Sequence, residues 1–166
     1  MAAGPGWWVG KIGQTWRHVR ARVRPGERAE LETWTTPAQR ALFDAMHVAD
    51  RRHGLDVVDH LRSAGVGEAD VLVAGLLHDA GKGDTGLVPR VAYALGQAYG
   101  HWLWRLAGLV PGVRVAIALL ADHAEGSARL AAAAGCSDRT VELIRWQEAP
   151  RDAEFGEHLR LADEAS

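Results

Sequence analysis

Apolar residues recur at helical spacing along most of the chain, and no stretch alternates apolar and polar residues as a strand does. The breaks between apolar segments fall at glycine and proline, as at Pro25-Gly26, Gly65 and Pro111-Gly112. The pattern therefore predicts an all-α fold, a compact multi-helix bundle of about seven to nine helices joined by short loops.

Start and stop signals give the expected bounds of these helices. Thr36 and Ser137 suit the N-cap position, and Pro37 suits the first helical position. We expect Pro25-Gly26 to end a first, arginine-rich helix. One expected helix, residues 16–24, lies ahead of the bundle, and the nine expected helical segments of the bundle cover residues 37–47, 51–64, 68–79, 88–99, 101–109, 113–121, 127–134, 138–148 and 153–165. We divide the chain into an N-terminal extension, residues 1–35, that packs on a main domain, residues 36–166.

One stretch has chemistry that helical packing alone does not explain. The apolar run from Val71 to Leu77 ends at the doublet His78-Asp79, which Gly81 and Lys82 follow. Neighbouring side chains on a helix point about 100° apart, so both can reach one object only if it lies between them at a helix end. A metal ion fits, because it accepts nitrogen and oxygen ligands from different directions. The alternative is a pair of polar residues at a helix C-terminus.

Histidines also occur at other expected helix ends and breaks. Of the eight in the chain, His53 is placed at the start of one helix, His101 after the break at Gly100, and His123 after an apolar helix. Helix ends that meet at one pocket would bring these imidazoles to the His78-Asp79 doublet. A single histidine of this kind is more often a structural residue, so the prediction depends on the joint pattern.

Composition limits the classes of function. A length of 166 residues suits one domain, and a formal net charge of −2 gives no sign of bulk nucleic-acid binding. The single cysteine, Cys136, suits a reducing compartment, and the N-terminus has no long apolar core. We expect a cytoplasmic protein that does not enter a membrane. The tryptophan-rich N-terminal extension could pack against a second copy, which would give a homodimer.

The motifs around these histidines resemble the HD-domain metal-dependent phosphohydrolases. The resemblance covers residues 36–166, and its most specific part is Leu76-Leu77-His78-Asp79-Ala80-Gly81-Lys82. Shorter matches are His53-Gly-Leu-Asp-Val57 and Leu161-Ala162-Asp163-Glu164. The resemblance implies an HD-domain-like helical bundle with one metal held by His53, His78, Asp79 and Asp163. His60 competes with His53 for the first position, and the match at Val57 favours His53.

Some members of that family hold two metals and use further histidines. His101 and His123 lie in suitable places, and His123-Ala-Glu125-Gly126 resembles a reduced form of the His-His-Glu segment of those members. Here Asp122 stands where one of the two histidines would be. The resemblance thus implies one metal and leaves a second open. The Gly-Tyr-Pro signature of the cyclic-dinucleotide branch is absent from the sequence, which disfavours that substrate.

The resemblance implies hydrolysis of a nucleotide or another small phosphate ester by metal-activated water. Mixed nitrogen and oxygen ligands suit Mn, Fe, Co, Ni or Zn. We expect Lys82 to contact the phosphate and to offset its charge, with Arg90 as a second contact and Asp84 orienting water; each could instead be an ordinary loop or helix-start residue. Two alternatives are a di-iron oxygenase of the two-metal type and a non-hydrolytic nucleotide-binding module.

Overall fold

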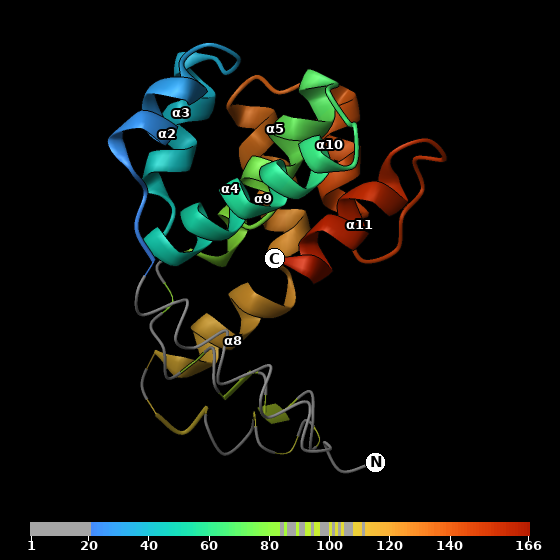
Figure 1. Cartoon of the computed structure of the whole chain (residues 1–166). Coiled ribbons are helices and arrows are strands. Elements are labelled where there is room, and N and C mark those ends of the chain that lie inside the picture. Colours follow the sequence, from blue (N-terminus) through green and yellow to red (C-terminus); the bar gives the residue numbers. More distant parts are fainter. Residues whose placement is uncertain are drawn as a thin grey trace.

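The computed structural model describes most of the chain after residue 20 and is all-α. The described residues are 21–83, 85, 89, 92–93, 95–96, 100, 102, 104, 108–110 and 112–166, and none of them is in a strand. The elements with described bounds are α2 (Pro25–Leu31), α3 (Pro37–Ala45), α4 (Val48–Ser63), α5 (Ala69–Leu77), the 3-10 helix η1 (Ala80–Lys82), α8 (Val113–Ala121), α9 (His123–Ala133), α10 (Asp138–Arg145) and α11 (Gly156–Ala165). The predicted all-α class is confirmed (Figure 1).

Helix α5 lies at the centre of the bundle. Every residue from Val71 to Leu77 is buried, as expected for a helix that is apolar on all sides. The helices α3, α4, α10 and α11 contact it, so that it is enclosed by other helices (Figure 1). Because α5 runs through the core, the residues that follow its C-terminus are also delivered to the interior.

Several predicted bounds are confirmed, and the one at Pro25 is wrong. Helix α8 has the predicted range, and Thr36 and Ser137 accept hydrogen bonds from the backbone N–H groups of Gln39 and Thr140 as N-caps. Pro25, however, begins α2 instead of ending a helix, since the first position of a helix needs no N–H group. The described part of the predicted 16–24 helix, residues 21–24, is not helical.

The start of α4 also differs from the prediction. The helix begins at Val48 instead of Arg51, because the His47 ring acts as its N-cap: His47 Nδ1 accepts a hydrogen bond from the backbone N–H of Ala49 at 3.2 Å. His53 therefore lies in the second turn of α4 and not at its start. The His53 ring therefore reaches the interior from within the helix and not from its end.

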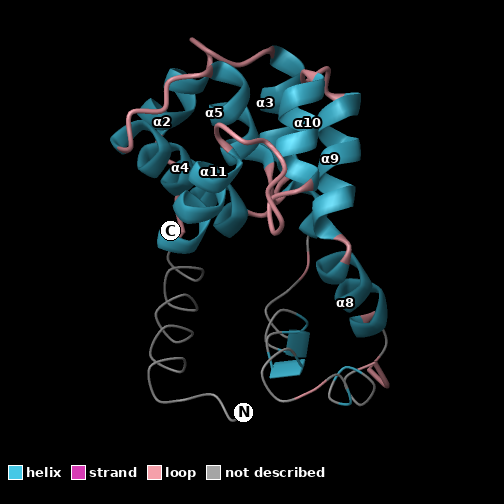
Figure 2. Ribbon diagram, turned by 90° about the vertical axis from the view of Figure 1, so that its right-hand side faces the viewer, coloured by secondary structure: helices cyan, strands magenta, loops and turns pink. Residues whose placement is uncertain are grey.

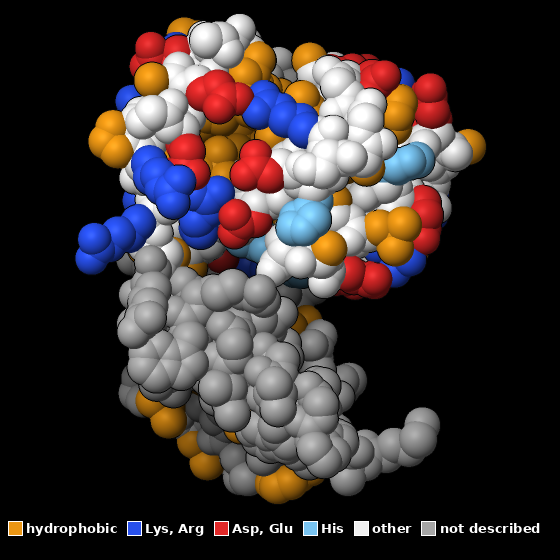
Figure 3. Space-filling view, viewed as in Figure 1, with side chains coloured by type: hydrophobic (Ala, Val, Ile, Leu, Met, Phe, Trp, Pro, Cys, Tyr) orange, Lys and Arg blue, Asp and Glu red, His pale blue; other side chains and the backbone are white. Residues whose placement is uncertain are grey.

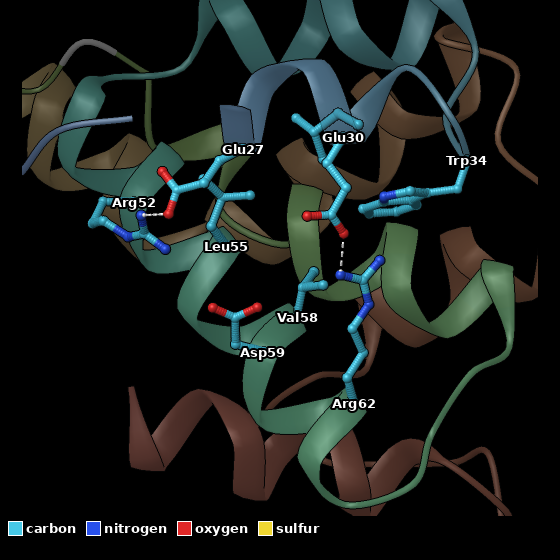
Figure 4. A pocket seen from close by; sticks show the side chains of 9 residues that line it. Glu27, Glu30, Trp34, Arg52, Leu55, Val58, Asp59 and Arg62 are labelled. Atoms are coloured by element: carbon cyan, nitrogen blue, oxygen red, sulfur yellow. Dashed lines mark hydrogen bonds and ion pairs between the residues drawn. The ribbon is translucent and has the colours of Figure 1, made fainter. Parts of the chain in front are cut away.

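Helix α2 packs on the outer face of α4 through an apolar contact and two ion pairs. Leu31 is only 1% exposed and belongs to the same core as α5. Glu27 pairs with Arg52 at 2.6 Å and Glu30 with Arg62 at 2.5 Å (Figure 4). The cavity between these helices is about 30 Å³, room for roughly one or two water molecules. The described end of the N-terminal extension thus packs on the main domain.

Helices α8, α9 and α10 form the other side of the molecule. The helices α9 and α10 lie side by side, and α8 extends from the start of α9 away from the bundle (Figure 2). Acidic and basic side chains are interspersed over the described part of the face shown in Figure 3. Across the described residues, no helix is both long enough and apolar enough to cross a membrane.

Candidate metal site

Three helices bring four predicted ligands to one place. His53 comes from α4, His78 and Asp79 follow α5, and Asp163 comes from α11. The donor atoms of His53, His78 and Asp163 all lie within 4.8 Å of one another. His53 Nε2 lies 2.8 Å from Asp163 Oδ1 and 3.9 Å from Asp79 Oδ2, and His78 Nε2 lies 3.4 Å from both Asp79 Oδ1 and Asp163 Oδ1. Donors that share one ion at about 2.0–2.2 Å lie roughly 3–4 Å apart, so these separations suit one ion.

The end of α5 explains how two neighbouring side chains both point inward. His78 is the C-cap and keeps helical angles, whereas Asp79 has φ −99° and ψ 3° and leads into η1. The backbone thus leaves the path of α5 at Asp79 and enters the tighter 3-10 turn. Both residues are only 2% exposed.

The imidazole of His78 is oriented by a backbone hydrogen bond. Its Nδ1–H donates to the Gly75 carbonyl at 2.8 Å, which directs Nε2 at the carboxylates. Among the described residues, neither His78 Nε2 nor Asp79 Oδ1 has a hydrogen-bond partner, although both atoms are buried. A buried polar group without a partner costs about 1–3 kcal/mol. Two such atoms facing each other at 3.4 Å fit a site for a cation.

His78 and the two aspartates of the cluster shift one another's pKa values toward the charged forms. Burial alone would lower the pKa of His78, but the carboxylates of Asp79 and Asp163 outweigh it and raise this pKa to about 9. Burial alone would raise the pKa of both aspartates. For Asp79, His78 and Lys82 outweigh burial, and for Asp163, His53 and His78 do, so that both pKa values lie well below their usual range. Both carboxylates are therefore ionised at neutral pH, whereas His78 is protonated in the metal-free protein, and a bound ion would displace its Nε2 proton.

Lys82 belongs to the cluster through the second oxygen of Asp79. Its Nζ donates to Asp79 Oδ2 at 2.6 Å, while Asp79 Oδ1 faces His78 and His123. The side chain of Lys82 is 24% exposed, so a positive charge lies between the buried ligands and the surface. The other predicted substrate and catalytic residues, Asp84 and Arg90, lie outside the described residues, as does the predicted ligand His101.

His123 lies beside the cluster, and its partner was not predicted from the sequence. His123 Nε2 is 3.8 Å from Asp79 Oδ1, and Gln147 Nε2 approaches the same ring nitrogen at 3.1 Å. Gln147 follows α10 and is only 6% exposed. A single glutamine after an amphipathic helix gives no sequence signal, because its place beside His123 comes from the packing of α10 on α9.

The structure distinguishes His53 from His60, its competitor on the same helix. His60 is exposed, and its Nδ1 contacts the Asp56 carbonyl and the Ser166 hydroxyl, 2.9 and 3.1 Å away. Only His53 of the two belongs to the cluster of potential ligands. His53, and not His60, thus lies next to the other predicted ligands.

A close backbone contact holds the doublet against α9. The Gly81 N–H donates to Ser127 Oγ at 2.7 Å, and a Cβ atom added at Gly81 would lie 2.4 Å from the His123 carbonyl oxygen. The glycine after the doublet is thus required by close approach. The contact fixes η1, and with it Asp79 and Lys82, relative to His123.

Comparisons of the chain with protein-family models, with curated proteins and with solved structures found no match. His53, His78 and Asp163, with Asp79 beside them, form a group that could hold a divalent ion through nitrogen and oxygen donors.

Proposed function

We propose that this protein is a metal-dependent phosphohydrolase that acts on a nucleotide or another small phosphate ester. The observation that carries the proposal is the pair of buried, unpartnered atoms His78 Nε2 and Asp79 Oδ1, which face each other within a cluster of ionised ligands. The resemblance of the Leu76–Lys82 segment to the HD-domain phosphohydrolases supports the same reading.

The ligand set suits a transition metal. Two imidazoles and two carboxylates provide the mixed donors that Mn, Fe, Co, Ni or Zn accept, and a hard ion such as Mg²⁺ prefers oxygen alone. When bound, such an ion supplies a Lewis acid and lowers the pKa of water to about 7. His53, His78, Asp79 and Asp163 would hold it, and the Gly75 carbonyl keeps His78 in the required tautomer.

Lys82 gives the site a fixed positive charge. Phosphoryl transfer spreads negative charge over the phosphate oxygens, and preorganised cations stabilise that charge. The Lys82 ammonium lies 2.6 Å from Asp79 Oδ2 and is partly exposed, so an incoming phosphate ester would meet it next to the ligands. Arg90 as a second phosphate contact and Asp84 as the residue that orients water stay predictions from the sequence.

The experiment that tests this proposal is a metal-supplemented activity screen. Protein stripped with a chelator is reloaded with each candidate metal and assayed against nucleoside mono-, di- and triphosphates, dinucleoside polyphosphates and generic phosphate esters. We expect metal-dependent release of phosphate or nucleotide, and a loss of roughly 100-fold or more in His53→Ala. His60→Ala is the matched control from the same helix and should keep its activity.

Two outcomes would overturn the proposal or redirect it. Full activity in the double variant His78→Ala, Asp79→Ala would refute a metal hydrolase at this site. Metal binding without hydrolysis of any ester would favour the non-hydrolytic module. About one non-iron ion per chain, measured by elemental analysis, would exclude the di-iron oxygenase.

A further inference from the structure

The hydrogen bonds of His123 fix its tautomer. Its Nδ1 lies 2.9 Å from the Leu120 carbonyl oxygen, which can only accept, so Nδ1 carries the proton. The Nε2 atom of the neutral ring then has a lone pair. Gln147 Nε2 lies 3.1 Å from it, and the carboxamide N–H donates to that lone pair. The reversed amide would instead place an oxygen against it.

The one lone pair on His123 Nε2 can accept a hydrogen bond or bind a metal ion, but it cannot do both at once. His123 Nε2 is only 3.8 Å from the unpartnered Asp79 Oδ1, so the two acceptors face each other across a gap that favours a cation. While the Gln147 amide donates to Nε2, this imidazole is not available as a ligand. The same hydrogen bond therefore competes directly with any ion that would lie between His123 and Asp79.

The cost of burying Gln147 points to a function for the amide. The residue is 6% exposed, and its Oε1 is buried without a hydrogen-bond partner among the described residues. An unpartnered buried carbonyl is destabilising, and a leucine of similar size would avoid that cost. Near both residues, Arg145 on α10 pairs with Glu125 on α9 at 2.9 Å, a contact that joins the two helices.

We propose that Gln147 sets the number of ions in the site: it occupies His123 and limits the cluster to one ion, held by His53, His78, Asp79 and Asp163. This inference rests on the metal site of the proposed function. Gln147 is a positioning residue, because it acts on the metal only through the imidazole of His123. Without its amide, His123 Nε2 and Asp79 Oδ1 become donors for a second, weaker ion.

The test is calorimetric titration of the full-length, metal-free protein with Co²⁺ alone, together with the visible absorption of the bound ion. The wild type should bind one Co²⁺ per chain. Gln147→Leu should show a second binding event that the wild type lacks, with an affinity at least about 10- to 100-fold above any residual second binding by the wild type, which is the scale on which hydrogen bonds to metal-binding imidazoles act. A second Co²⁺ absorption band should accompany it.

Two further variants separate this role from a general effect on folding. Gln147→Asn keeps the carboxamide but is one methylene shorter, so it should lose the contact and behave as Gln147→Leu does. The double variant Gln147→Leu, His123→Ala should return to one Co²⁺ per chain. Thermal unfolding of each variant establishes that it is folded.

The opposite results overturn the inference. Two ions per wild-type chain, or one ion in all variants, would show that Gln147 does not control occupancy while leaving the proposed hydrolase intact. No bound Co²⁺ in any variant, the wild type included, would refute both the inference and the metal site on which the proposed function depends.

Discussion

Replacement of Gly81 by alanine adds only one methyl group, but it should destabilise the protein strongly. The added Cβ would lie 2.4 Å from the His123 carbonyl oxygen, 2.5 Å from the Ser127 nitrogen and 2.8 Å from the Gly126 carbonyl carbon. All three are backbone atoms, so no side-chain rotation relieves the overlap. The 3-10 helix η1 and α9 must separate by about 1 Å to restore van der Waals contact.

The size of the effect follows from that separation. Overpacking usually costs about 1–3 kcal/mol, and we expect about 3 kcal/mol because the atoms in conflict belong to backbone. For a chain of this size, that corresponds to a fall in Tm of roughly 6–12 °C. The displacement also moves Asp79, which leads into η1, relative to the other proposed ligands, so the affinity for metal should fall as well.

Gly126→Ala is the matched control, since it adds a methyl group to the other side of the same contact. Its Cβ would lie 3.5 Å from Gly81 Cα and 3.8 Å from Gly81 O, which are ordinary contacts. Alanine also favours a helix interior over glycine by about 1 kcal/mol. Circular dichroism melting in chelator measures both variants. A Tm for Gly81→Ala equal to that of the wild type, or a larger loss in Gly126→Ala, would refute the reasoning.

Three further predictions concern the ion, pH and a buried hydrogen bond. A divalent ion at 100 times its Kd should stabilise the fold by about 2.7 kcal/mol and raise Tm by roughly 5–11 °C, and a His78→Ala protein melted with the same ion should show no such shift. The guanidinium of Arg139, which hydrogen-bonds Asp152, lowers the pKa of that carboxyl to about 2. Because the pKa is lower in the folded state, the stabilisation is present above about pH 4 and is lost as the pH falls toward 2. Urea midpoints for the wild type and Asp152→Asn should therefore differ at pH 6 and converge near pH 2, and a constant difference would contradict this. Ser127→Ala removes the acceptor of the Gly81 N–H and should cost about 1–3 kcal/mol in chemical denaturation, and an unchanged midpoint would mean that another group replaces it.

Local signals in the sequence were sufficient for the fold class and for several helix bounds. Helical periodicity and hydroxyl N-caps depend on neighbouring residues, so Thr36 and Ser137 were identified as the starts of α3 and α10. The unbroken apolar run of α5 predicted burial, and the His78-Asp79 doublet at its end predicted two polar groups in the interior. Local signals failed at two helix starts. Pro25-Gly26 is compatible with the end of one helix or the start of the next, and histidine is not among the residues that usually form an N-cap.

The composition of the site was decided by tertiary structure. His53 and His60 lie on one helix, and the packing of α4 against α5 and α11 brings His53 to Asp163. Gln147 reaches His123 because α10 packs on α9, an arrangement that no local pattern specifies. A helix's own sequence fixes which face is apolar, but the neighbours of that face come from contacts between segments distant in the chain. The sequence thus determined that a histidine and an aspartate would meet at the end of a buried helix, and the tertiary structure decided which side chains surround them.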